Sequence, residues 1–120
     1  MDSGKIVRER LDLMIGAEMI SERTAGFCMK AARILLEEHK DLDLEKLNML
    51  ITHLAMAADR MERGETGEEA LGAETFEAVK GEPCFEKAVC LGERILRDAP
   101  AKFTGTETDF LTVHLCNLFM

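Results

Sequence analysis

Two histidines, each with a charged residue at the same spacing, are the positions in this chain best suited to chemistry. Arg60 follows His53 by seven residues and Glu107 precedes His114 by seven, so the two patterns mirror each other. Seven residues is close to two helical turns, which places each histidine and its charged residue on one helix face, about 10.5 Å apart along the axis. Such a histidine is a candidate for phosphate, proton or metal chemistry.

Three interpretations of these histidines compete. Each histidine is a packing residue at a helix–helix margin, a metal ligand, or an acceptor of a phosphoryl group. Neither has a second ligand three or four residues away, and there is no Cys-x-x-Cys motif, so we predict no metal site and no cofactor. Phosphoryl acceptance fits a neutral imidazole that attacks phosphorus while the guanidinium of Arg60 holds the phosphate oxygens.

The remaining residues offer no arrangement typical of an enzyme. The two serines, Ser3 and Ser21, are both expected at helix starts, which leaves no nucleophile–base pair for hydrolysis. No glycine-rich loop stands between a strand and a helix, as a nucleotide-binding loop would require. The sequence therefore predicts a protein that is not an enzyme.

Composition favours one compact helical domain over residues 1–120. A hydrophobic fraction of 47% supplies a core, but with six Phe and no Trp or Tyr that core must consist of Leu, Ile, Ala and Met. The net charge of −8 disfavours direct binding to nucleic acid. The sequence has no apolar run long enough for a membrane span and no apolar block typical of a signal peptide. We therefore expect a cytoplasmic location with the four cysteines reduced.

Apolar residues recur at helical spacing and predict an all-α bundle of five or six helices. We expect one helix over residues 5–19, a second after Ser21 that fades near residues 39–40, and a third with an apolar stripe from Leu44 to Met61. A shorter helix is expected over residues 70–79, a fifth from Pro83 through Leu96, and a last one after Thr106 with a stripe that reaches Leu118. The expected boundary residues are the N-caps Ser21, Asp41 or Asp43, and Thr106, the opening proline Pro83, and the helix-ending Gly64.

A helical wheel places His53 and Arg60 roughly 120–140° from the centre of the apolar stripe of their helix. Met49 and Met56 share that second side, which suggests an interface covered by another helix, a second subunit or a docking protein. His114 lies beside a leucine stripe of its own helix, at the expected margin of the core.

At these residues the chain resembles the PTS regulation domain (PRD) family. That family carries a histidine in a segment close to D-H-I-x-F-A-x-x-R-x-x-x-G, and residues 52–64 read T-H-L-A-M-A-A-D-R-M-E-R-G. A second family histidine ends a segment like P-x-x-E-x-x-Y-I-x-L-H, which matches residues 107–114 with Phe110 at the aromatic position. The resemblance spans roughly residues 11–117, with the two motifs in the family's order and separation.

The resemblance implies a five-helix bundle that often forms a homodimer. It implies that His53 and His114 accept phosphate from the phosphocarrier protein HPr or from a sugar-specific IIB component of the phosphotransferase system. Arg60 and Glu107 would be supporting charged positions. Phosphorylation would change dimer packing and so regulate transcription through protein contacts.

Two departures bear on this expectation. Thr52 replaces the usual acidic residue before the first histidine, and Asp109 stands where a small residue is common. With one such domain and no nucleic-acid-binding segment, the chain is expected to act in trans, by pairing with a larger PRD-containing regulator or by competing for phosphoryl donors. The alternatives are a degenerate paralogue or helical scaffold that acts only by binding partners, and a small helical metalloenzyme.

Overall fold

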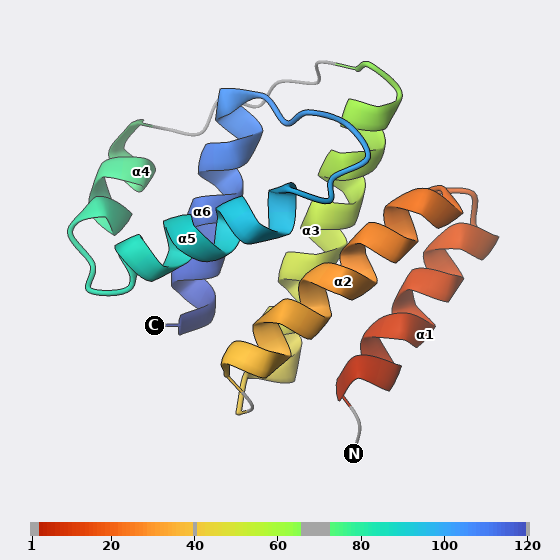
Figure 1. Cartoon of the computed structure of the whole chain (residues 1–120), viewed down its shortest axis with the longest axis horizontal. Helices are drawn as coiled ribbons and strands as arrows, with labels where there is room; N and C mark the ends of the chain where they lie inside the picture. The colour runs from red at the N-terminus through yellow and green to blue at the C-terminus, as the bar shows by residue number, and fades with distance from the viewer. Residues whose placement is uncertain (1–2, 40, 66–72, 120) are drawn as a thin grey trace.

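The protein folds as an all-α bundle (Figure 1). The computed structural model describes residues 3–39, 41–65 and 73–119. These residues form six helices, which confirms the predicted fold class; they are α1 (Ser3–Gly16), α2 (Glu22–Glu38), α3 (Leu44–Glu62), α4 (Ala73–Lys80), α5 (Phe85–Leu96) and α6 (Gly105–Phe119).

The helix starts and stops follow local chemistry. The side chain of Ser21 accepts a hydrogen bond from the Thr24 amide, and that of Asp43 accepts from Glu45 and Lys46, so both expected N-caps are confirmed. Gly64 has φ 72°, the left-handed conformation that ends a helix without steric cost, which confirms the expected stop after α3.

Two predicted helix starts were wrong. Pro83 does not open α5; it lies in a turn in which the Phe85 amide donates to the Glu82 carbonyl at 3.1 Å, a position that suits a residue with no N–H. The cap of α6 is Thr104 rather than Thr106, because the Thr104 hydroxyl accepts from the Glu107 amide at 3.2 Å.

Other helix boundaries shifted by a few residues. The first helix, expected over residues 5–19, runs over Ser3–Gly16 and is followed by Glu18 with φ 59°, a left-handed residue that turns the chain. The helix expected over residues 70–79 runs over Ala73–Lys80, and residues 70–72 lie outside the described residues. Lys40, part of the expected end of α2, is also outside them, whereas His39 is the C-cap.

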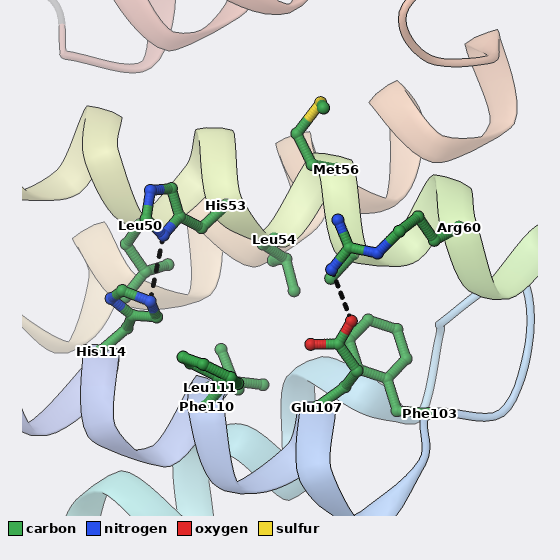
Figure 2. Close-up of a pocket in the computed structure, with 11 residues that line it drawn as sticks. Leu50, His53, Leu54, Met56, Arg60, Phe103, Glu107, Phe110, Leu111 and His114 are labelled. Atoms are coloured by element: carbon green, nitrogen blue, oxygen red, sulfur yellow. Dashed lines mark hydrogen bonds and ion pairs between the residues drawn. The ribbon is translucent and has the colours of Figure 1, made fainter. Parts of the chain in front are cut away.

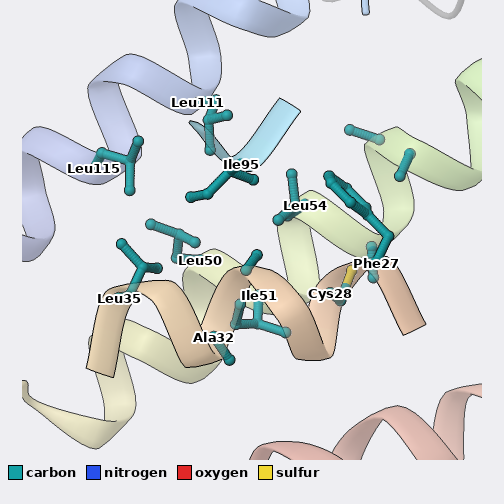
Figure 3. Close-up of a cluster of buried hydrophobic side chains, with 14 of the residues drawn as sticks. Phe27, Cys28, Ala32, Leu35, Leu50, Ile51, Leu54, Ile95, Leu111 and Leu115 are labelled. Atoms are coloured by element: carbon teal, nitrogen blue, oxygen red, sulfur yellow. The ribbon is translucent and has the colours of Figure 1, made fainter. Parts of the chain in front are cut away.

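Every helix contributes buried apolar side chains to the core, and α2, α3, α5 and α6 contribute most of them. Leucine and isoleucine side chains from α2, α3, α5 and α6 meet between the helices (Figure 3); the labelled ones include Leu35, Leu50, Ile51, Leu54, Ile95, Leu111 and Leu115. The apolar stripe predicted for α3 is buried from Leu47 to Met61, while Leu44 at its start is half-buried. Among the described residues, no helix has the length and apolar character needed to cross a membrane.

Helices α3 and α6 are neighbours that run in opposite directions, with α3 rising and α6 descending in Figure 1.

A polar cluster fixes the C-terminal end of α3 against the start of α2. Glu62 accepts hydrogen bonds from Ser21 Oγ at 2.8 Å and Thr24 Oγ1 at 2.9 Å. Asp59 Oδ1 accepts from the Ser21 amide at 3.2 Å. The core on one side and this cluster at one end hold the α3 face that carries His53 and Arg60.

Candidate functional site

The two mirrored patterns pair across helices α3 and α6. His53 lies opposite His114, and Arg60 lies opposite Glu107 (Figure 2). A step of seven residues forward along α3 is matched by seven residues backward along α6, as the antiparallel direction of the helices requires. The equal spacing in the sequence therefore positions two cross-helix contacts, two helical turns apart.

The first contact joins the two imidazole rings. His53 Nδ1 lies 3.1 Å from His114 Nε2, and the ring centroids are 4.7 Å apart with the planes nearly perpendicular, at 89°. The Phe110 ring stacks on His114 at 6.2 Å and 19° and restrains its orientation from within α6. His53 is exposed and His114 is half-buried, so the expected positions outside the core and at its margin are confirmed.

Protonation of His114 is disfavoured by burial and by a neighbouring charge. Desolvation lowers the pKa of His114, and the nearby His53 lowers it further, so the neutral form of His114 is favoured at pH 7. A neutral ring with its lone pair on Nε2 accepts a hydrogen bond from His53 Nδ1–H. In that tautomer the His53 proton stands on Nδ1 and the lone pair of His53 stands on Nε2.

The second contact is an ion pair near the start of α6. Arg60 Nη2 donates to Glu107 Oε2 at 2.6 Å; the Glu107 side chain is 9% exposed and the Arg60 side chain 32%. Arg60 Nε is buried and has no hydrogen-bond partner. Glu107 follows the cap Thr104 by three residues, the position from which a capping glutamate often returns to the cap, but here its carboxylate faces Arg60.

Both contacts line one cleft of about 640 Å³ between α3 and α6. Its walls between the two polar pairs are apolar, and Phe103 from the segment before α6 lies beside Glu107 (Figure 2). The cleft residues are Leu50, His53, Leu54, Met56, Ala57, Arg60, Phe103, Glu107, Phe110, Leu111 and His114. The arrangement provides exposed imidazole nitrogen at one end and a guanidinium at the other.

The other candidate residues do not all line the cleft. Met56 lines the cleft and is half-buried, whereas Met49 is 59% exposed and does not line it. The hydroxyl of Thr52, the residue before His53, donates to the Asn48 carbonyl at 2.8 Å and accepts from Arg10 Nε at 2.7 Å. Those bonds engage its hydroxyl away from His53, and His114 stands as the hydrogen-bond partner of that ring.

The contacts of His53 with His114 and of Arg60 with Glu107 were not predicted from the sequence. Each histidine had been matched with the charged residue on its own helix, whereas the contacts form between helices. The mirrored spacing was a signal for this arrangement once an antiparallel α3–α6 pair is assumed. Phe110, four residues before His114, and Phe103 were not singled out as site residues, although the first is at the spacing of side chains that stack along a helix.

No protein-family model, curated protein or solved structure matches this chain.

Proposed function

We propose that this domain is a phosphotransferase-responsive regulatory module of the PRD type, phosphorylated on His53 and His114 and acting through protein contacts. One observation carries the proposal: His53 Nδ1 faces His114 Nε2 at 3.1 Å, which leaves Nε2 of the exposed His53 ring as the unengaged nitrogen. A neutral imidazole with its proton held on Nδ1 is a nucleophile at Nε2. We therefore assign His53 Nε2 as the first acceptor.

The transfer step uses the second histidine as a proton acceptor. The lone pair of His53 Nε2 forms a bond to phosphorus while the P–N bond of a donor phosphoimidazolium breaks, and its electron pair returns to the donor ring. The donor leaves as neutral imidazole, and His53 takes over the positive charge. The Nδ1 proton then moves onto His114 Nε2, and His114 releases a proton to solvent, so His53 ends as neutral phosphoimidazole and His114 as neutral imidazole.

Arg60 is the group suited to hold the phosphate. Its Nε is buried without a partner and its contact with Glu107 engages Nη2 alone, so further guanidinium donors remain for phosphate oxygens. The axial distance of about 10.5 Å between residues seven apart on a helix is within the combined reach of an extended arginine and a phosphorylated histidine. Movement of Arg60 toward phosphate would leave the nearly buried Glu107 without its partner and so change the start of α6.

The partners proposed here are those that the resemblance to the PRD family implies. The donor would be HPr or a sugar-specific IIB component, and the output partner a second copy of the chain or a larger PRD-containing regulator. A phosphoryl group brings about −1.5 to −2 charges at neutral pH on a hydroxyl side chain, and a similar change on His53 would alter any interface that includes the exposed Met49. The Met49 and Met56 side of α3 is therefore the surface on which we expect phosphorylation to act.

The test is phosphorylation with the general phosphotransferase components, phosphoenolpyruvate and a series of IIB components. We expect acid-labile phosphate on wild-type protein and on His39→Ala, which replaces an exposed histidine at the end of α2. His53→Ala should lose the first phosphate. His114→Gln should lose its own and slow transfer to His53.

Absence of phosphate on both histidines with all donors tried would refute the proposal. If dimerisation and partner binding were then also unchanged in His53→Ala and His114→Gln, the scaffold alternative would hold.

A further inference from the structure

The histidine pair has a second chemical use that depends on the same short contact. Two nitrogen atoms from rings on different helices face each other at 3.1 Å, at the end of an open cleft. Each ring has one lone pair when neutral. Two imidazole nitrogens held this closely are a potential chelate.

The separation of the nitrogens fits adjacent ligands of one metal ion. Bonds of 2.0–2.1 Å in a tetrahedral zinc site place two histidine nitrogens about 3.3 Å apart. Neighbouring ligands at right angles around a nickel or copper ion lie about 2.9 Å apart. The observed 3.1 Å lies between these values, so the nitrogens already have the separation of adjacent ligands, and rotation of both rings off the N···N line would direct their lone pairs at one ion.

The surroundings restrain one ligand and leave the other accessible. Stacking on Phe110 holds the His114 ring, and the exposed His53 ring is open to ions and water. The nearest charged pair along the cleft, Arg60 with Glu107, is neutral as a unit and two helical turns away. No group of three or more His, Cys, Asp or Glu suited to a metal is found in the part of the chain that the structure describes.

We propose that His53 Nδ1 and His114 Nε2 form a two-histidine clamp for a divalent transition-metal ion that favours imidazole, with water in the other coordination positions. This site differs from the prediction of no metal site, which considered only ligand pairs within one helix. Two protein ligands leave the ion exchangeable, so the clamp is suited to reversible occupancy rather than to a permanent structural ion.

Occupancy would also control phosphorylation, a consequence that rests on the proposed function. An ion on His53 Nδ1 takes the lone pair there, and the ring proton must then stand on Nε2. That removes the nucleophilic lone pair from the nitrogen that attacks phosphorus. The same ring therefore either accepts phosphate, with its Nδ1 proton directed to His114, or binds the ion.

Titration with Ni²⁺ tests the clamp, because nickel favours imidazole while thiolates prefer softer ions. By calorimetry we expect saturable one-to-one binding to the wild-type protein and to His39→Ala. In both His53→Ala and His114→Gln, affinity should fall by more than about tenfold, since each variant retains one ligand. No saturable binding, or binding unchanged in either variant, would overturn the clamp; the second result would assign the ion to other groups such as the cysteines.

A phosphorylation assay with and without saturating Ni²⁺ tests the coupling separately. HPr is phosphorylated beforehand, and its phosphate content is followed in the same reaction as an internal control. We expect loss of phosphate transfer to His53 while the donor stays phosphorylated. Unchanged transfer at saturating Ni²⁺ would reject the coupling, and absence of transfer without metal would reject the proposed function, while the calorimetric result stands on its own.

Discussion

The guanidinium of Arg60 and the carboxylate of Glu107 form a 2.6 Å ion pair at the cleft end opposite the two histidines, and this pair ties the last turn of α3 to the first turn of α6. Glu107 is nearly buried and Arg60 is one-third exposed, so the carboxylate depends on its partner for solvation more than the guanidinium does. Loss of Arg60 should therefore lower the stability of the protein more than loss of one partner of an exposed ion pair would.

We expect Arg60→Met to destabilise the protein by about 2 kcal/mol, because it leaves a nearly buried carboxylate without a donor. The matched control is Lys80→Met, which breaks the exposed Lys80–Glu77 pair and should cost less than about 0.5 kcal/mol. Urea denaturation followed by circular dichroism measures both. Equal losses in the two variants would show that the Arg60–Glu107 pair adds no more than a surface contact.

The N-cap of α6 can be tested by comparing variants of two nearby threonines, Thr104 and Thr106. Thr104→Ala removes the hydroxyl that accepts from the Glu107 amide and should cost about 1 kcal/mol. Thr106→Ala, at the position that the sequence pattern favoured, changes an exposed residue inside the helix and should be neutral or slightly stabilising. Thermal denaturation of the two variants decides between the caps, and the reverse order of stability would restore Thr106.

These caps show which part of the fold is encoded locally. The apolar period of 3.6 residues is a property of each helix alone, so the stripe on α3 and the exposed face of His53 could be predicted from the sequence. Thr104 and Thr106 both satisfy the local preference for a cap. The choice between them depends on where the segment containing the buried Phe103 packs, which is set by the tertiary structure.

The candidate site was predictable in its residues but not in its contacts. A helical wheel shows which residues share a face and says nothing about which helix covers that face or in which direction it runs. His53 and His114 are 61 residues apart, and their contact requires the antiparallel packing of α3 on α6. The same packing replaces the expected His53–Arg60 and Glu107–His114 neighbours with the pairs observed.

A stabilising substitution is expected at Gly92 in α5. A Cβ atom there would lie 3.6 Å from Leu115 Cδ1 and 3.8 Å from Leu111 Cδ2, which are ordinary contact distances in the core. Gly92→Ala should therefore raise stability by about 0.5–1 kcal/mol, since it lowers the entropy of the unfolded chain and improves helix propensity without a clash. The urea midpoint should rise; a lower midpoint would mean that α5 and α6 lie closer together than described.

The polar cluster at the end of α3 predicts a loss of stability in acid. Hydrogen bonds from Ser21 and then from Thr24 lower the pKa of Glu62 below its ordinary value of 4.5. Because the unfolded state binds this proton at a higher pH than the folded state does, the contribution of Glu62 is fully present above pH 4.5 and is lost as pH falls through the lowered pKa.

Glu62→Gln removes that titration while keeping an oxygen that accepts from Ser21 and Thr24. The variant should be less stable than wild type at neutral pH, and the difference should shrink as the pH falls below 4.5, because the wild-type carboxylate becomes neutral there. Glu77→Gln serves as the control, since that carboxylate lies in the exposed pair with Lys80. Midpoints of urea unfolding measured across this pH range test the assignment. A gap between wild type and Glu62→Gln that stayed constant with pH would mean that the Ser21–Thr24–Glu62 contacts do not favour the charged carboxylate.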